Sequence, residues 1–256
     1  MATKKLTRKE LKQEDQFIKF AKQTIVFVKE HKDRINLGVM ITAVVAILIS
    51  LVVFSVRHSN AKAAALLNDG WKAYDQAIKP ASQQQPQEAL DDEGIAKARD
   101  ENLKKSIESF SEVVSEYSSS SAAPNAMYLL ANAYYRTTDY PAAAEHFGKF
   151  LAEYPKHTLV SAAKIGMAYC QEAQGKFPEA LTLLEEMLPE AHNFYSKPQI
   201  YIDIARVALL AGQTPKSVQY YKRYLSEFPD GASAEKILNK LAEIAPEEAA
   251  ALNPAS

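Results

Sequence analysis

The first pattern along the chain is a long run of apolar residues near its amino terminus. From Leu37 to Val56 the sequence LGVMITAVVAILISLVVFSV contains twenty residues without a charge. A helix of this length crosses the hydrocarbon layer of a bilayer. Thr42, Ser50 and Ser55 are compatible with that layer, because a hydroxyl can donate to a carbonyl one turn back. The pattern predicts a transmembrane helix over this run; the alternative is the buried core helix of a soluble protein.

Before the run, apolar residues recur at steps of three and four positions, with lysines between them. This spacing predicts an amphipathic helix with a basic polar face inside the tail of residues 1–34. The apolar-face positions are Phe17, Phe20, Ala21, Thr24, Ile25 and Val28, and the lysines are Lys19, Lys22 and Lys29. Three interpretations remain open: the helix lies on an anionic inner leaflet, it is a solvated tail helix, or it pairs with a partner helix.

The charges on either side of the apolar run predict its orientation. Residues 1–34 carry ten Lys and Arg residues, whereas only Arg57 and Lys62 follow the run closely. Because cytoplasmic flanks are enriched in basic residues, we expect the amino terminus in the cytoplasm and the carboxyl terminus across the membrane. A signal peptide cleaved near Ala61-Lys62-Ala63 is the competing interpretation. The run is longer than the usual apolar core of a signal peptide, which favours an anchor.

After the run, residues of similar character return every 37 positions. One column holds large apolar side chains, two hold small ones, and one holds Pro. The columns are Phe110, Phe147, Leu184 and Tyr221; Ser106, Ala143, Ala180 and Ser217; Ala131, Ala168 and Ala205; and Pro141, Pro178 and Pro215. Such self-similarity at a fixed period is the signature of a repeat architecture.

Each repeat is predicted to be a hairpin of two helices. The first helix ends near Thr138, Gly175 or Gly212, and Gly readily takes the left-handed conformation that follows a helix. The second helix begins around the Pro, whose missing N–H needs no partner in a first turn. One hairpin cannot bury its own apolar face, so stacked hairpins are expected to form a solenoid with a continuous core.

The predicted fold class is therefore all-α, with an N-terminal transmembrane helix followed by a right-handed α-solenoid of about four helix hairpins and a capping helix. Few Gly residues and many Ala, Leu, Glu and Lys residues agree with this class. The expected boundaries are 61–245 for the repeat domain, 61–79 and 99–117 for its first hairpin, 80–98 for an insertion loop, 234–245 for the capping helix, and 246–256 for a disordered tail.

Charge and cysteine content argue against several function classes. The net charge of the 256 residues is −1, but the part after residue 34 carries 20 basic against 26 acidic residues. An acidic main body argues against a nucleic-acid partner, because phosphate binding needs a basic face. Cys170 is the only cysteine, so neither an intramolecular disulfide nor a cysteine zinc cluster can form. It shares a column with Ala133 and Val207, which predicts a structural packing position.

The sequence lacks the common motifs of catalysis and cofactor binding. It contains no Gly-rich phosphate loop, no H-E-x-x-H and no G-x-S-x-G. No histidine has a second histidine four residues on, which argues against a metal site. The histidines are His31, His58, His146, His157 and His192. We therefore expect no catalytic residue, metal, cofactor or small-molecule substrate.

The repeats resemble the tetratricopeptide repeat. The segment AMYLLANAYYRTTDYPAAAEHFGKFLAEYP has the family's spacing of large-x-x-Leu-Gly-x-x-Tyr, Ala-x-x-x-Phe and terminal Pro, at Met127, Leu130, Ala131, Tyr134, Ala143, Phe147 and Pro155. The resemblance implies a protein-binding scaffold whose first helices line a concave groove. Carried over by position, the groove residues are Asn125, Tyr128, Asn132, Tyr135, Arg136, Ile165, Tyr169, Glu172, Gln199, Ile202, Arg206 and Leu209.

This set of groove residues contains few cations. Arg136 and Arg206 stand without a supporting Lys, whereas repeats that grip a C-terminal carboxylate combine several Lys, Arg and Asn residues. The Tyr, Ile and Leu side chains therefore favour an extended or helical apolar segment as the ligand. The alternative is that many of these positions are ordinary packing between repeats.

The whole layout resembles the ancillary SecYEG translocon subunit family of Gram-negative inner membranes, including the leader QFIKFAKQTIVFVKEHKDR before the apolar run. This resemblance implies a periplasmic module beside the translocon that meets emerging chains and passes them to periplasmic chaperones. The segments EYPKHTLVSAA and EFPDGASAEK also resemble repeats of envelope-assembly proteins, such as the Tol-Pal cell-division coordinator and the repeat lipoprotein of outer-membrane assembly. A structural scaffold in envelope biogenesis or cell division is therefore the second hypothesis, and an enzyme is the third.

Overall fold

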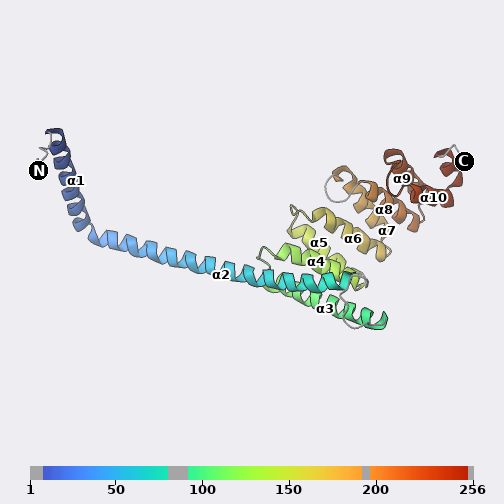
Figure 1. Cartoon of the computed structure of the whole chain (residues 1–256), viewed down its shortest axis with the longest axis horizontal. Helices are drawn as coiled ribbons and strands as arrows, with labels where there is room; N and C mark the ends of the chain where they lie inside the picture. Colours follow the sequence, from blue (N-terminus) through green and yellow to red (C-terminus); the bar gives the residue numbers. More distant parts are fainter. Residues whose placement is uncertain (1–7, 80–91, 192–196, 253–256) are drawn as a thin grey trace, which may run out of the picture. The chain divides into compact units, whose positions relative to one another are not determined.

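The computed structural model describes residues 8–79, 92–191 and 197–252, and these ranges contain helices and no strand (Figure 1). The all-α prediction is confirmed. The helices are α1 (Arg8–Glu30), α2 (Lys32–Ile78), α3 (Asp92–Glu116), α4 (Ala123–Arg136), α5 (Tyr140–Glu153), α6 (Val160–Ala173), α7 (Phe177–Met187), the short 3-10 helix η2 (Leu188–Glu190), α8 (Lys197–Leu210), α9 (Thr214–Glu227), α10 (Ala234–Ile244) and α11 (Pro246–Leu252). The chain forms two compact units, residues 1–58 and 59–256.

The first unit contains the apolar run as part of α2. All side chains from residue 37 to residue 56 are exposed, and α2 is long and apolar enough to cross a membrane. The hydroxyl of Thr42 donates to the Val39 carbonyl at 2.9 Å, and that of Ser50 donates to the Ala46 carbonyl at 2.8 Å. These bonds satisfy both hydroxyl groups within the helix, as an apolar surrounding requires.

The second unit begins within α2, which runs without a break to Ile78. The expected first repeat helix, 61–79, is therefore the end of this same helix. It packs against α3, because a Cβ added at Gly70 would lie 2.6 Å from Cε1 of Phe110. Asn60 also accepts the Ser121 backbone N–H at 2.9 Å. The first hairpin thus pairs α2 with α3, a pairing that the sequence left open because of the insertion.

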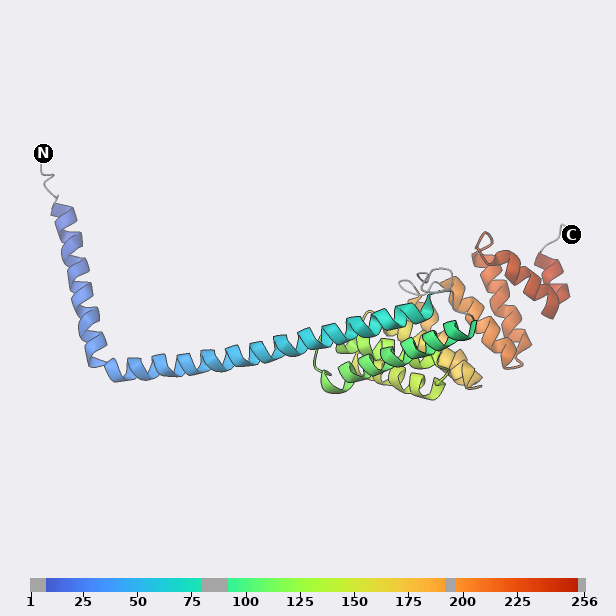
Figure 2. The ribbon, with the colours of Figure 1, turned by 60° about the horizontal axis from the view of Figure 1, so that its bottom comes forward.

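The following hairpins are α4 with α5, α6 with α7 and α8 with α9, and Figure 2 shows them succeeding one another from green to orange-red. Three of the four columns of the 37-residue period are buried along this stack, and the Pro column is exposed. The large column and the two small columns are at most 5% exposed, over Phe110, Phe147, Leu184 and Tyr221; Ser106, Ala143, Ala180 and Ser217; and Ala131, Ala168 and Ala205. Small residues let two helices approach, and the large residue fills the space beside them.

The three complete first helices end in the same turn. Thr138, Gly175 and Gly212 have φ angles of 62°, 73° and 72°, the left-handed conformation that Gly takes without a steric penalty. The N–H of each of these residues donates to the carbonyl three positions back, and the next N–H donates five positions back, at 2.8 to 3.1 Å. This is the Schellman arrangement, which satisfies carbonyls left open at a helix end. The predicted helix ends are confirmed.

The second helices begin as their prolines predict. Pro141, Pro178 and Pro215 occupy the first or second helical position of α5, α7 and α9. In α5 the Asp139 side chain accepts the Ala142 N–H at 3.1 Å and so caps the helix. The same turn and the same helix start therefore recur in each hairpin, which fixes a regular stack.

The α3 boundary differs from the prediction. The helix begins at Asp92, so residues 92–98, assigned to the insertion loop, are helical. Ala and Lys favour a helix here, and Ile95 and Ala98 are half-buried. The rest of the predicted insertion loop, residues 80–91, lies outside the described residues.

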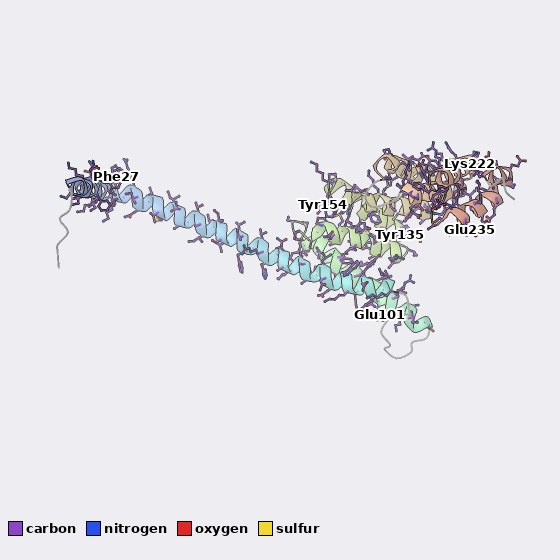
Figure 3. All side chains as sticks on the ribbon, turned by 45° about the horizontal axis from the view of Figure 1, so that its top comes forward. Phe27, Glu101, Tyr135, Tyr154, Lys222 and Glu235 are labelled. Atoms are coloured by element: carbon purple, nitrogen blue, oxygen red, sulfur yellow. The ribbon has the colours of Figure 1, made fainter. Side chains whose placement is uncertain are left out.

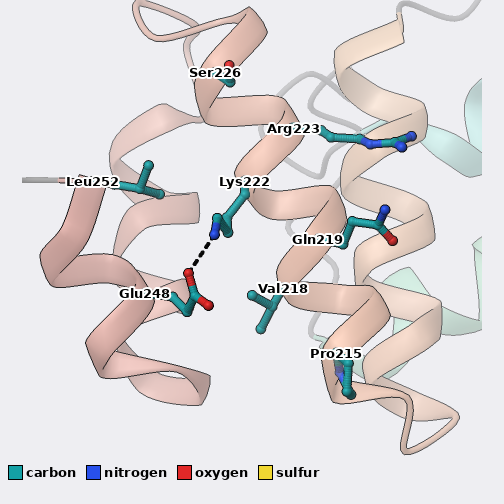
Figure 4. A pocket seen from close by; sticks show the side chains of 8 residues that line it. All are labelled: Pro215, Val218, Gln219, Lys222, Arg223, Ser226, Glu248 and Leu252. Carbon is teal, nitrogen blue, oxygen red and sulfur yellow. Dashed lines mark hydrogen bonds and ion pairs between the residues drawn. The ribbon is translucent and has the colours of Figure 1, made fainter.

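The carboxyl end also differs, because the predicted disordered tail begins with the short helix α11. Pro246 starts this helix, two Glu residues follow in its first turn, and both features favour a helix start. Ala249 is buried, and Glu248 pairs with Lys222 of α9 at 2.5 Å. The capping helix α10 is therefore followed by a second short helix, α11. A depression of about 570 Å³ is lined by residues of α9 and α11 (Figure 4). Residues 253–256 lie outside the described residues.

Cys170 occupies the packing position that its column predicted. It is fully buried, as are Ala133 and Val207. Burial raises the pKa of the Cys170 thiol to about 12. The thiolate, which is the reactive form, is therefore scarce at neutral pH.

Candidate protein-binding groove

A depression of about 410 Å³ lies across three successive hairpins of the second unit. Its lining comes from α4, α6, the start of α7, and α8, through Tyr135, Tyr169, Glu172, Ala173, Phe177, Arg206 and Leu210. We call these residues the groove pocket. Figure 3 labels Tyr135 on α4. Because three of the four contributing elements are first helices, the pocket lies on the surface that the repeat resemblance assigned to the groove.

Two carboxylates from neighbouring hairpins hold Arg206 at the pocket. Its guanidinium donates to Asp203 Oδ1 at 2.9 Å and to the Glu172 carboxylate. Burial opposes the positive charge, but the hydrogen bonds to Asp203 and Glu172 outweigh burial and raise the pKa of Arg206. The guanidinium therefore stays charged and already has two anionic partners.

Asp203 organises this network from below the surface. Its residue is only 3% exposed, and its second oxygen accepts the Tyr169 hydroxyl at 3.0 Å. The guanidinium of Arg206 also lies over the Tyr169 ring, 5.8 Å from its centroid. A buried carboxylate needs such partners, because removing one partner of a buried ion pair lowers the free energy of unfolding by about 3–5 kcal/mol. The network therefore fixes α6 against α8.

Aromatic rings form the remaining wall of the pocket. The Tyr135 and Tyr140 rings meet edge to face, with centroids 5.3 Å apart. Burial raises the pKa of Tyr135, with smaller contributions from neighbouring groups, so its hydroxyl remains a protonated donor at neutral pH. Leu210 is 55% exposed beside this wall. The pocket thus offers aromatic and aliphatic surface around an internally paired Arg.

The structure brings four of the twelve predicted groove residues together in the pocket: Tyr135, Tyr169, Glu172 and Arg206. Asn125 and Arg136 are exposed on α4, and Gln199, Ile202 and Leu209 are half-buried on α8, but none of them lines the pocket. Asn132 is half-buried and donates to the Tyr128 carbonyl at 2.8 Å. The other eight residues of the predicted set therefore lie outside this pocket, and their role in binding stays a prediction.

Of the other predicted groove residues, Ile165 is buried and Tyr128 takes part in packing. Ile165 is 6% exposed and belongs to the core formed around α7 and α8, which corrects its assignment to an accessible surface. Tyr128 packs against the rings of Phe147 and Phe150, at centroid distances of 5.9 and 6.1 Å. Ile165 turns inward because the next hairpin is packed closely against α6. Tyr128 is half-buried, and the rings that it contacts belong to α5 of its own hairpin.

Sequence reasoning missed four residues of this site. Ala173 and Leu210 follow Arg136 at steps of 37 positions, so the period itself would have identified them once Arg136 was chosen. Phe177 starts a second helix, outside the positions that the resemblance transfers. Asp203 was missed because a buried Asp has no distinctive spacing, and only its contacts to Tyr169 and Arg206 reveal its role.

Comparison with known proteins gives the same architecture. A family model described as a tetratricopeptide repeat-like domain matches residues 38–197, and a tetratricopeptide repeat model matches residues 165–232. A search of curated proteins found no match. Two crystal structures of nearly identical TPR-like repeats, from a Podosopora anserina protein assigned as a kinesin light chain, share 19% identity with this chain. They cover 61% of this chain and 85% and 86% of their own, with TM-scores of 0.51 and 0.52. At this identity the similarity establishes the fold alone.

Proposed function

Because the chain belongs to the tetratricopeptide repeat-like domain family, matched over residues 38–197, we propose that it is a membrane-anchored module that binds apolar segments of other protein chains in the groove pocket. Repeats of this kind form protein–protein interaction modules, and nothing in the fold points to catalysis. The observation that carries the proposal is the pairing of Arg206 with two carboxylates.

This pairing favours one of two ligand chemistries. A clamp for a C-terminal carboxylate needs cations that are free to bind it. In the groove pocket the only Arg already bonds Glu172 and Asp203, and Asp203 is buried. Tyr135, Phe177 and Leu210 leave aromatic and aliphatic surface available to a ligand. An apolar side chain of an extended or helical segment suits this pocket better than a terminal carboxylate.

The anchor is the run from Leu37 to Val56, with the amino terminus in the cytoplasm and the repeat domain in the periplasm. The wholly exposed apolar side chains and the basic residues before the run support this topology. The family match begins at residue 38, so it includes the run together with the repeats. Ala63, at the alternative signal-peptidase site, is buried inside the first hairpin, which favours a permanent anchor.

The placement beside the Sec translocon rests on the layout that this chain shares with the ancillary SecYEG subunit family. In this proposal the groove pocket meets emerging periplasmic or outer-membrane chains, which are still unfolded and expose apolar segments. The repeat domain then passes them to periplasmic chaperones. A scaffold in envelope biogenesis or cell division would use the same groove for folded partners, and the client identity separates the two functions.

Photocrosslinking from the groove pocket tests this function. A photoreactive residue in place of Leu210, in the full chain in its membrane, should trap unfolded secreted chains. Adding Ala173→Arg should lower the crosslinked yield about tenfold or more, because a ligand would desolvate the new charge. Ala152→Arg is the matched control, since Ala152 is also an exposed helical Ala, on α5 and outside the pocket.

Equal loss with both Arg variants would refute a specific pocket. Crosslinks to folded envelope proteins alone, with none to secreted chains, would refute the translocon role and favour the scaffold.

Protease protection tests the orientation separately. In sealed spheroplasts, added protease should degrade the repeat domain and leave a short amino-terminal fragment, whereas inverted inner-membrane vesicles should protect residues 59–252. The physical reason is that protease cannot cross the bilayer. A periplasmic and a cytoplasmic marker protein serve as controls for sealing. Degradation of the repeat domain in sealed inverted vesicles would contradict the proposed topology.

A further inference from the structure

The helix α1 presents a large apolar surface that no part of the described chain covers. Phe17 is 72% exposed and Phe20 is 69% exposed, and Ile25, Phe27 and Val28 are exposed as well. Soluble proteins rarely expose contiguous apolar patches of this kind, and such patches mark sites of interaction. Figure 3 shows the side chains of this helix, with Phe27 labelled.

The apolar side chains occupy one half of the α1 surface. At roughly 100° per residue, the positions on this half are Phe17, Ile18, Phe20, Ala21, Thr24, Ile25, Phe27 and Val28. Over residues 17–30, the other half carries Lys19, Lys22 and Lys29, together with Gln23, Glu30 and a single apolar residue, Val26. Thr24 does not interrupt the apolar half, because its hydroxyl donates to the Phe20 carbonyl at 2.9 Å. We call the first group the apolar face of α1.

The segment around this face is positively charged. From residue 16 to residue 35 it carries five basic residues, Lys19, Lys22, Lys29, Lys32 and Arg34, against the two acidic residues Glu30 and Asp33. Lysines beside an apolar face can extend their stems along it and keep their ammonium groups in water. An anionic lipid surface supplies the complementary charge and the apolar layer together, whereas a partner helix would have to supply both in one groove.

The apolar face also lies next to the membrane span in the chain. The helix α1 ends at Glu30 and α2 begins at Lys32, and within this unit the helix axis changes direction between them (Figure 2). At the turn, the Phe27 ring stacks on the His31 ring at a centroid distance of 4.4 Å. Only six residues separate Glu30 from Leu37, the first residue of the apolar run. A span that starts at Leu37 therefore holds α1 close to the bilayer surface.

We propose that α1 lies along the cytoplasmic surface of the membrane, with its apolar face inserted between lipids and its lysines bound to anionic phospholipid headgroups. The inference rests on the proposed anchor. In this arrangement the apolar face of α1 leaves water, and the lysines gain favourable electrostatic contacts. The surface helix also sets the depth at which α2 enters the bilayer.

Depth measurement with spin labels tests this placement in the full chain. Cys170→Ala removes the only cysteine, and single cysteines are then introduced by Phe20→Cys on the apolar face, by Lys22→Cys on the polar face, and by Ala46→Cys in the span. The labelled proteins are reconstituted in vesicles of phosphatidylcholine with phosphatidylglycerol, and in phosphatidylcholine alone. The measurement compares collisions with oxygen, which concentrates in lipid, and with a water-soluble nickel complex.

In the anionic vesicles, the label at position 20 should collide mainly with oxygen, and the label at position 22 should collide mainly with nickel. Each Lys near an anionic surface strengthens binding about fivefold. Replacing Lys19, Lys22 and Lys29 by Gln together, with the label at position 20, should therefore lower the ratio of inserted to free helix about a hundredfold. The same replacement should change little in phosphatidylcholine alone, which serves as the lipid control.

The outcomes separate the inference from the anchor on which it rests. Suppose that the label at position 46 is protected from nickel, but that the label at position 20 collides with nickel as often as the label at position 22. The surface placement of α1 is then overturned, and the anchor stands. If the label at position 46 meets nickel freely, the anchor itself is wrong. If position 20 is protected in both lipids and the lysine replacements change nothing, the role of anionic lipid is overturned. Spin–spin broadening between copies at position 20 would indicate a partner helix instead.

Discussion

Replacing Phe147 by Ala is expected to lower the free energy of unfolding of the repeat domain by about 3–5 kcal/mol. Phe147 is 1% exposed and packs against the Tyr128 ring. It also fills the space that Gly166 leaves on the next hairpin, because a Cβ at Gly166 would lie 2.3 Å from its Cζ atom. The substitution therefore removes contacts within one hairpin and between two. Since each hairpin is held only by its neighbours, the loss of stability should be largest in the hairpins at the middle of the stack.

Urea unfolding of the full chain in detergent, followed by circular dichroism, measures this loss. Hydrogen exchange should show the largest loss of protection in α4 to α7. A double-mutant cycle with Gly166→Ala provides the control. Alone, Gly166→Ala should cost about 1–3 kcal/mol, because the new methyl group clashes with the buried Phe147 ring. In the Phe147→Ala background this cost should disappear, because the ring is gone.

Gly148→Ala is the matched reference for a helical Gly without such a neighbour. Apart from the local backbone of α5, no atom lies within 4 Å of a Cβ added there, so the substitution should stabilise the domain by about 0.5–1 kcal/mol. If Gly166→Ala were as harmless as Gly148→Ala, or kept its full cost after Phe147 is truncated, the proposed contact between the hairpins would be contradicted.

The periodic part of the fold was predictable because each of its recurring features, namely the helix end, the helix start and the close helix contact, depends on one residue type at one position. A helix end needs a left-handed residue, which places Gly at positions 175 and 212, and a helix start favours Pro, as at positions 178 and 215. Close helix packing needs a small side chain in each repeat. These requirements recur at every hairpin, so they leave a period in the sequence that can be found without knowing the fold.

The ends of the solenoid were less predictable, since they occur once and leave no period. Residues 92–98 lengthen α3 by two turns, although nothing in the other repeats corresponds to them. The helix α11 depends on a tertiary contact, the pairing of Glu248 with Lys222 of α9. The helical state of both segments is supported by packing as well as by propensity. Local composition, which does not include packing, therefore assigned them to loop or tail.

The assignment of the groove to the first helices stays a prediction. Position within a repeat selected Tyr135, Tyr169 and Arg206, and these three residues line one pocket. It could not show that Ile165 turns into the core, because the same position faces solvent or a neighbour depending on the size of the surrounding side chains. The pairing of Arg206 with Glu172 was likewise not visible, since Glu172 reaches it from α6, whereas Asp203 stands three residues before Arg206 on the same helix.

Arg206→Leu is expected to lower the free energy of unfolding by about 2 kcal/mol. Removal of one partner from a buried ion pair costs about 3–5 kcal/mol, and we reduce this value because water screens the Arg206 side chain, which is 39% exposed. The loss arises because Asp203 and Glu172 lose the cation that both carboxylates bond, and the two negative charges then repel each other. Denaturant unfolding of the full chain measures it.

Lys216→Leu is the matched control, because Lys216 pairs with Glu185 at 2.9 Å and both side chains are 34% exposed. A pair this exposed contributes about 0–1 kcal/mol. Adding Asp203→Asn to Arg206→Leu should recover part of the loss, because one of the two repelling carboxylates is then neutral. Equal, small effects of Arg206→Leu and Lys216→Leu would contradict a buried network.

Crosslinking separates a structural role of Arg206 from a role in binding a ligand's carboxylate. If Arg206 only holds α6 against α8, Arg206→Leu should lower the stability of the fold. The crosslinks from position 210 should nevertheless persist at a temperature where the domain stays folded. Loss of those crosslinks in the folded variant would instead make Arg206 part of the ligand contact.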